Sequence, residues 1–240
     1  AGNIGGGGFM VYRKANGETG TLDYREKAPL SATKNMFLDK AGNLLPDKST
    51  DSPLAIGVPG TIAGVFAVHE KLGSLPMSEI MKPVIELAEK GVIVTKKQEK
   101  SLNNYREAII KANGNTTKFA TIFKENDTIK YPALAETLKR IAKNGKDEFY
   151  KGETSQQLVR YFEKIGAIIT HEDLAQYQAK WRNSLEFNYK ELKIISMAPP
   201  SSGGICLAQI MKMIAPFDIK SMGQNSAETI QVMVEAERRA

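Results

Sequence analysis

A hairpin signal near the amino terminus constrains the fold of this chain of 240 residues more than any other stretch. Two β-prone runs, within residues 4–13 and 19–29, flank the dipeptide Asn16-Gly17. Asn and Gly both tolerate positive φ angles, and a type I′ turn requires such angles at both of its central positions. The sequence therefore predicts an antiparallel hairpin closed by a type I′ turn.

Side chains on the second strand of this hairpin alternate between two faces. Leu22 and Tyr24 lie on one face, whereas Thr21, Asp23 and Arg25 lie on the other. We expect the hairpin to bury one face. We expect it to carry Arg25 on the opposite face, at the end of the strand.

Four consecutive glycines, Gly5 to Gly8, precede the first strand. Such a run loses much conformational entropy on folding, so it is kept where the backbone turns sharply or approaches another group closely. The run matches neither the GxxxxGK[ST] phosphate loop nor the GxGxxG fingerprint, and no strand precedes it. Close packing against another segment is the favoured interpretation, and a phosphate cradle is the disfavoured one.

Hydrophobic periodicity indicates that the rest of the chain is mostly helical. Residues 46–53 form a polar loop in this interpretation. The expected elements are helices over 76–90, from 95 onward, over 133–144, over 154–164 and after 201–204, with strands within 184–196. The apolar face of the helix over 76–90 consists of Ile80, Val84, Leu87 and Ala88.

Most of the polar residues outside the hairpin that could be catalytic have a structural explanation instead. His69 lies on or beside an apolar helical stripe. Thr170 is a good helix N-cap, so we interpret the nearby carboxylates of Glu172 and Asp173 as capping groups. The serines at 201–202 are expected to cap a helix, because the sequence that surrounds them is not the GxSxG of a nucleophile elbow.

Composition excludes several classes of function. The net charge is +6, from 33 basic and 27 acidic residues, but the basic residues are scattered and form no nucleic-acid stripe. No apolar run approaches the roughly 20 residues that span a membrane. Cys206 lies in an apolar run, and one cysteine with two histidines assembles no recognisable zinc site. We therefore expect no metal, no cofactor, no nucleic-acid partner and no membrane span in this segment.

Six motifs resemble, in order and spacing, the large chain of the gamma-glutamyltranspeptidase family, also called glutathione hydrolases. They lie at residues 5–10, 23–29, 36–39, 57–61, 148–152 and 199–204. The resemblance implies an N-terminal-nucleophile hydrolase whose precursor cuts itself into a large and a small chain. It further implies that the small chain begins with the nucleophilic threonine and that the protein is periplasmic or secreted.

The implied fold is an α+β four-layer αββα sandwich, of which residues 1–240 would be a single incomplete domain. We expect this part to be helix-rich, with few strands and an unfinished apolar surface. The chain is expected to be a piece of a longer protein and to form a heterodimer with the small chain. The complete protein would transfer or hydrolyse the γ-glutamyl group of glutathione and related amides.

Arg25 is the one substrate-binding residue that the resemblance implies for this chain, as the group that holds the α-carboxylate of the γ-glutamyl donor. A guanidinium presents a rigid fork to a carboxylate and stays charged at any working pH. The simpler alternative is a strand-end arginine paired with Asp23 or Glu26.

No catalytic residue is expected within residues 1–240, so this chain alone should be inactive. Thr116-Thr117 is internal and lacks the sequence that follows the family's cleavage point. Two other functions stay open: a related acylase of the cephalosporin type, and a non-catalytic binding fragment.

Overall fold

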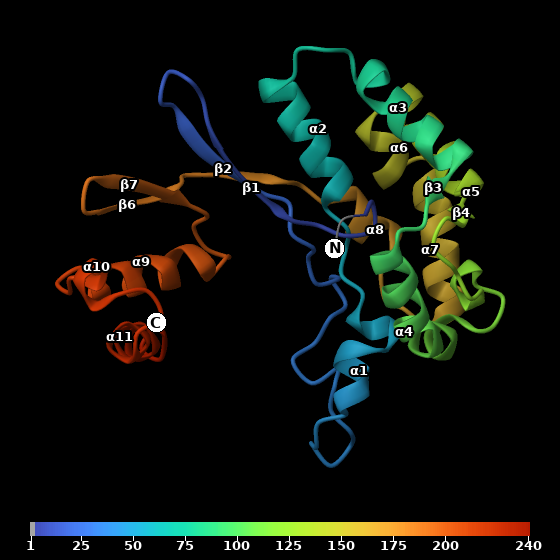
Figure 1. The fold of residues 1–240 in the computed structure, drawn as a ribbon. Coiled ribbons are helices and arrows are strands. Elements are labelled where there is room, and N and C mark those ends of the chain that lie inside the picture. Colours follow the sequence, from blue (N-terminus) through green and yellow to red (C-terminus); the bar gives the residue numbers. More distant parts are fainter. Residues whose placement is uncertain (1–2) are drawn as a thin grey trace.

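The predicted hairpin forms the centre of the molecule in the computed structural model, which describes residues 3–240 (Figure 1). Strands β1 (Phe9–Arg13) and β2 (Thr19–Asp23) pair antiparallel, with Phe9 opposite Asp23. A third strand that the sequence analysis did not predict, β5 (Lys180–Arg182), pairs antiparallel with the other edge of β2. β2 is therefore the central strand of a three-stranded sheet.

The turn of the hairpin differs from the type I′ prediction. Lys14 N donates to Glu18 O at 2.8 Å, and Gly17 N donates to Lys14 O at 3.0 Å. Gly17 has a φ of 89°, whereas Asn16 is not among the described residues with positive φ. This is the pattern of a three-residue loop with one left-handed glycine. The Asn16 side chain accepts a hydrogen bond from Glu18 N at 3.0 Å, so it supports the loop without a positive φ.

The expectation that the hairpin buries only one face is also wrong. Leu22 and Thr21 point to opposite faces of β2, and both are fully buried. Thr21 Oγ1 donates to Arg182 O at 3.0 Å, because β5 and the chain that follows it cover this face. A hydroxyl with a backbone acceptor is easily accommodated in such a site.

The glycine run packs closely against two segments, as the sequence analysis favoured. Gly8 exchanges backbone hydrogen bonds with Tyr24 at 3.3 and 3.0 Å, and Gly6 O accepts from Gly60 N at 2.8 Å. A Cβ atom on Gly7 would lie 2.5 Å from Tyr24 O, closer than any real side chain permits. These glycines therefore allow close approach between backbones.

A body of helices packs on one side of the hairpin (Figure 1). It consists of α2 (Thr61–Leu72), α3 (Met77–Lys90), α4 (Lys96–Asn113), α5 (Pro132–Asn144), α6 (Lys146–Tyr150), α7 (Glu153–Ile165) and α8 (His171–Ala175). The short strands β3 (Val92–Ile93) and β4 (Thr128–Ile129) pair beside them. The main core lies here and includes Ile62, Leu138, Ile141, Phe149 and Phe162.

The apolar face predicted for residues 76–90 is only partly buried. The helix itself is confirmed as α3, but Ile80, Val84 and Leu87 remain 40%, 49% and 55% exposed. Met81 and Ala88 are the buried residues, in one cluster with residues of α5. α5 covers only one side of α3, so most of the predicted stripe stays about half exposed in the described part of the chain.

The polar loop predicted at 46–53 contains short helical turns. Residues Pro46–Thr50 form α1, and Pro53–Ala55 form the 3-10 helix η1. Pro occupies the first turn of both, where its missing N–H costs no hydrogen bond. The sequence Thr95-Lys96-Lys97-Gln98 has the form of a capping box and makes one. Residues 170–173 make a second capping box, with Thr170 as the predicted N-cap.

The last elements form a separate layer, here called the C-terminal layer (residues 185–240; orange to red in Figure 1). It contains the antiparallel pair β6 (Leu185–Tyr189) and β7 (Leu192–Ser196), followed by α9 (Gly203–Ile214), α10 (Ile219–Met222) and α11 (Ala227–Glu237). α9 packs on β6 and on α11. No helix in the described part of the chain is both long and apolar enough to cross a bilayer.

The serine cap predicted for α9 is wrong in detail. Ser202 occupies the N-cap position but makes no capping hydrogen bond through its side chain. Ser201 Oγ accepts instead from Gly203 N, at 3.4 Å. The backbone packs tightly at this point, because a Cβ atom on Gly204 would lie 2.2 Å from Met197 O. The start of α9 therefore depends on glycine at position 204, where a side chain would clash with the backbone, and not on a serine cap.

Candidate functional site

The backbone of Arg25 is fixed immediately after the end of β2. Arg25 N donates to the carboxylate of Asp23 at 3.1 Å. Arg25 O accepts a hydrogen bond of 2.7 Å from the hydroxyl of Tyr177, which follows α8 in the chain. Two contacts from different parts of the chain therefore hold the residue in place.

The guanidinium of Arg25 has no carboxylate within ion-pair distance among residues 3–240, and its side chain is exposed. The carboxylate of Asp23 instead accepts from Arg182 Nη2 at 2.8 Å and from Arg182 Nε at 3.0 Å. The alternative that pairs Arg25 with Asp23 or Glu26 is therefore wrong. The two-donor contact of Arg182 occupies Asp23 and leaves the fork of Arg25 available.

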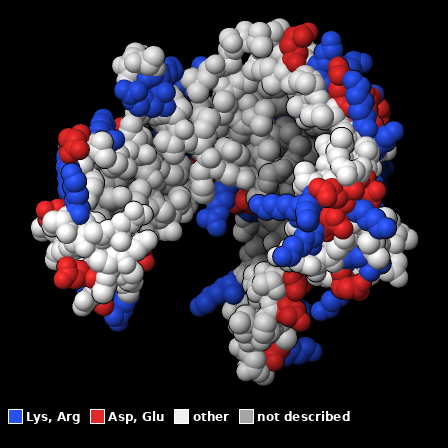
Figure 2. All heavy atoms as spheres, in the orientation of Figure 1, with Lys and Arg blue, Asp and Glu red and all other residues white. Residues whose placement is uncertain are grey.

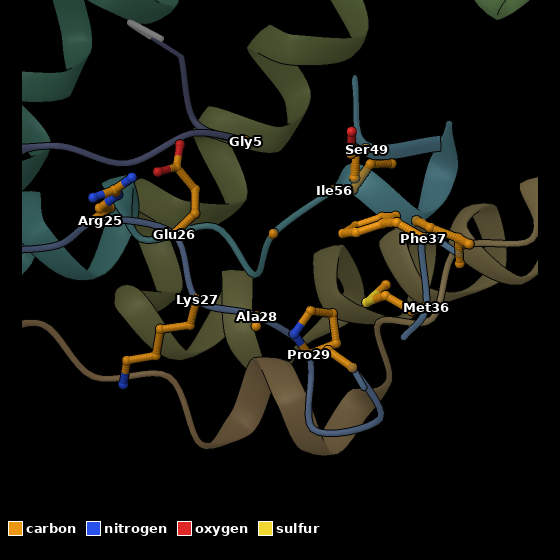
Figure 3. A pocket seen from close by; sticks show the side chains of 14 residues that line it. Gly5, Arg25, Glu26, Lys27, Ala28, Pro29, Met36, Phe37, Ser49 and Ile56 are labelled. Atoms are coloured by element: carbon orange, nitrogen blue, oxygen red, sulfur yellow. The ribbon is translucent and has the colours of Figure 1, made fainter. Parts of the chain in front are cut away.

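Two cavities meet at Arg25. The first has a volume of about 580 Å³ and lies between the residue segment 25–29 and the turns around Phe37 and Ile56 (Figure 3). Its wall combines charged side chains with apolar ones such as Pro29 and Phe37. Such a wall suits a small polar molecule with an apolar middle.

The second cavity has a volume of about 410 Å³ and lies toward β5. Arg25, Glu26 and Lys27 line both cavities. The remaining walls of the second cavity are Asp23, Tyr177, Gln178, Lys180, Arg182 and Pro200. Pro200 belongs to the motif at 199–204, so this cavity also borders the C-terminal layer.

Two tyrosines support the floor of the site. The rings of Tyr150 and Tyr177 stack with centroids 5.7 Å apart. The Tyr150 hydroxyl donates to Pro59 O at 2.9 Å and accepts from Ala63 N at 3.1 Å. Burial raises the pKa of both phenols well above the ordinary value, so both keep their protons.

Close approach at Gly60 completes the support of this floor. A Cβ atom there would lie 2.0 Å from Tyr24 O and 2.1 Å from the Tyr177 hydroxyl. This explains the glycine at position 60 of the motif at residues 57–61. Only glycine leaves room there for Tyr177, whose hydroxyl binds Arg25 O.

The site is electropositive. Burial lowers the pKa of Lys27 below its ordinary value, and the nearby charges of Lys180 and Arg182 lower it further, against the opposing effect of Asp23. Figure 2 shows Lys and Arg side chains bordering the hollow between the C-terminal layer and the helical body.

The other candidate residues lie away from these cavities' walls and have structural roles. His69 Nε2 lies 2.7 Å from Leu75 O. Asp173 accepts hydrogen bonds from Thr170 N and Leu30 N, at 2.8 and 2.6 Å, which confirms its capping role. Cys206 is half-buried, in partial agreement with the expectation of an apolar environment.

Sequence reasoning did not find Tyr177, Lys180 and Arg182, which form most of one wall. Lys180 and Arg182 reach the hairpin through the pairing of β5 with β2, and Tyr177 through its hydrogen bond to Arg25 O, each across more than 150 residues of chain. A three-residue strand carries little periodicity, so no local signal was available.

The comparisons with known proteins agree with this geometry. The family model described as gamma-glutamyltranspeptidase matches residues 1–240. The chain therefore belongs to the gamma-glutamyltranspeptidase family, as the motifs indicated. It is 42% identical over 244 residues to the glutathione hydrolase proenzyme of Escherichia coli strain K12. That alignment covers all of this chain and 42% of the relative, so the chain spans less than half of the relative's length.

Solved structures show the same fold. The crystal structure of the Helicobacter pylori gamma-glutamyltranspeptidase matches with a TM-score of 0.95 and 44% identity, over 99% of this chain and 69% of that one. The cephalosporin acylase from Bacillus halodurans matches with a TM-score of 0.81 and 22% identity, over 98% of this chain and 44% of that one. At that identity the acylase shares the fold, and its chemistry does not transfer.

Proposed function

We propose that this chain is the large-chain part of a glutathione hydrolase, and that Arg25 binds the α-carboxylate of a γ-glutamyl donor. The observation that carries the proposal is the unpaired guanidinium at the meeting point of two cavities. A fork with two parallel N–H groups fits a carboxylate better than an ammonium does. Membership of the family supports the choice of a γ-glutamyl group as the donor.

In the proposed reaction the chemical step belongs to a threonine at the start of the small chain. Its hydroxyl oxygen attacks the γ-carbonyl carbon of the donor, its own α-amine takes the proton, and the amine of the donor leaves. Backbone N–H groups stabilise the oxyanion that forms. Water or an acceptor amine then attacks the glutamyl ester, which returns the threonine hydroxyl. Residues 1–240 supply binding, and they contain no catalytic group.

Residues 1–240 are proposed to be a single incomplete domain of a four-layer αββα sandwich, completed in a heterodimer by the small chain from the same precursor. The exposed apolar side chains support this proposal. They include Val84 and Leu87 on α3 and Ile230, Met233 and Val234 on α11. Large apolar surfaces of this kind mark contacts with further protein. We place the protein in the periplasm or outside the cell by analogy with the family.

An activity panel on the complete processed protein tests this function. We expect hydrolysis of γ-glutamyl anilide, much slower hydrolysis of glutaryl anilide, and none of either by residues 1–240 alone. Glutaryl anilide keeps the carboxylate and lacks the amine, so it is the matched control. A preference for the glutaryl donor would instead indicate an acylase, and activity of the 240-residue chain would exclude the proposed division of labour.

A further inference from the structure

The cavity beside β5 contains more positive charge than the protein neutralises. Arg182 and Asp23 satisfy each other at 2.8 Å. Lys27 and Lys180 line the same cavity, and neither has a carboxylate within ion-pair distance among the described residues. Four basic side chains, those of Arg25, Lys27, Lys180 and Arg182, therefore line this cavity with only two carboxylates, those of Asp23 and Glu26. Neither ammonium group is in ion-pair contact with either carboxylate.

The pairing of β5 with β2 explains why Lys180 has no partner. Lys180 stands directly opposite Asp23 in the antiparallel register, where opposite charges would normally pair. The carboxylate of Asp23 is already taken by both donors of Arg182, which come from two residues further along β5. Lys180 thus stands opposite a residue whose carboxylate is already paired with Arg182.

Lys27 is held toward the same cavity by a tyrosine. Its ammonium lies 5.1 Å from the centroid of the Tyr177 ring, within the range of a cation–π contact. The nearest acidic neighbour in sequence does not compensate it, because the Glu26 and Lys27 side chains leave the backbone in opposite directions (Figure 3). Glu26 lines both cavities, but its carboxylate points toward Gly5, which lines only the larger of the two.

We propose that Lys27 and Lys180 form an anion subsite for a second carboxylate of the donor, the C-terminal carboxylate of the peptide attached to the γ-glutamyl group. The inference rests on the proposed function, because Arg25 lines this cavity and would hold the first carboxylate. Two lysines act as point charges and suit a single carboxylate that approaches from solvent. The donor class is therefore a γ-glutamyl peptide with a free C-terminus.

Kinetics of the complete processed protein with a matched pair of donors test the subsite. The donors are glutathione and glutathione amidated at its C-terminus, which differ only in the second carboxylate. For the wild type we expect a lower KM with glutathione. Lys180→Gln should raise the KM for glutathione about fivefold, the effect of one partly exposed ion pair, and leave the KM for the amide unchanged.

The double variant Lys27→Gln with Lys180→Gln should remove the preference between the two donors. Lys212→Gln, an exposed lysine on α9, is the control and should change neither KM. Equal KM values for both donors in the wild type would overturn the subsite. So would an equal rise for both donors in Lys180→Gln, the result expected if a carboxylate of the partner chain occupies the cavity.

Turnover of γ-glutamyl anilide separates this inference from the function on which it rests. The anilide has no second carboxylate, so Lys180→Gln should change its KM less than it changes the KM for glutathione. Hydrolysis of the anilide without any preference between the two glutathione donors would overturn the subsite alone. Failure of the wild type to hydrolyse any of the three donors would overturn both proposals.

Discussion

At the scale of single residues, the choice of partners among charged groups defines the site. The carboxylate of Asp23 could pair with the guanidinium of Arg25, two residues away, but it pairs with that of Arg182 on another strand. A largely buried carboxylate needs strong donors, and Asp23 obtains two from one guanidinium. The guanidinium of Arg25, just beyond the end of β2, therefore has no carboxylate partner among the described residues and lines two cavities.

Glu148 shows the opposite case, a carboxylate with a purely structural role. It is only 6% exposed, and it accepts hydrogen bonds from Thr154 N, Thr154 Oγ1, Arg140 and Asn144. Burial opposes its ionisation, but these hydrogen bonds outweigh burial and lower its pKa below the ordinary 4.5. The carboxylate ties α5, α6 and the start of α7 together.

Glu148→Gln should destabilise the complete protein by about 2 kcal/mol at pH 7, because it removes the charge that pairs with Arg140 and turns the oxygen that accepts from Asn144 Nδ2 into a donor. A lowered folded pKa contributes stability above the unfolded value, and that stability disappears as pH falls through the folded pKa. The difference between wild type and variant should therefore shrink below pH 4.5. Urea denaturation at several pH values measures it.

The matched control is Glu163→Gln, at an exposed position with no ion pair among the described residues. It should change stability by less than about 0.5 kcal/mol. A pH-independent cost for Glu148→Gln would show that the ionised form of Glu148 is not the stabilising one.

At the scale of elements, features set by neighbouring residues could be predicted and features set by distant ones could not. The capping boxes at Thr95 and Thr170 depend on residues three positions away, and both are present. The inward face of α3 depends on where α5 lies, so the stripe of Ile80 and Leu87 was assigned wrongly. The pairing of β5 is non-local in the same sense.

Gly7 offers a test of how the strand entry positions Arg25. A Cβ atom there would meet Tyr24 O at 2.5 Å and Glu26 N at 2.8 Å, and backbone cannot move aside cheaply. Gly7→Ala should cost about 2 kcal/mol through overpacking. It should also raise the KM for γ-glutamyl anilide, because the displaced segment carries Arg25. Thermal denaturation and steady-state kinetics of the complete protein measure the two effects.

The control for this substitution is Gly203→Ala, in the first turn of α9. A Cβ atom there would lie 3.6 Å from Ser201 Oγ, an ordinary contact. It should preserve both stability and KM. Normal kinetics of Gly7→Ala together with reduced stability would mean that the glycine matters for folding and does not position Arg25.

At the scale of the whole molecule, the site lies where the helical body, the central hairpin and the start of the C-terminal layer meet. All residues of the main buried cluster lie between Val58 and Tyr177 in the sequence, so the helical body has a core of its own. The resemblance of residues 23–29 to the family pointed to Arg25. The walls around it could not be predicted, because Tyr177, Lys180 and Arg182 arrive through long-range packing.

The most direct test of the account is the KM of Arg25→Ala in the complete processed protein with two donors, γ-glutamyl anilide and 4-aminobutyryl anilide. The second donor lacks only the α-carboxylate. We predict a roughly thirtyfold rise in KM for the first donor, as expected for the loss of charge-assisted hydrogen bonds, and no change for the second. Arg160→Ala, at an exposed site on α7, should alter neither value. An unchanged KM for γ-glutamyl anilide, or an equal rise for both donors, would contradict the assignment of Arg25.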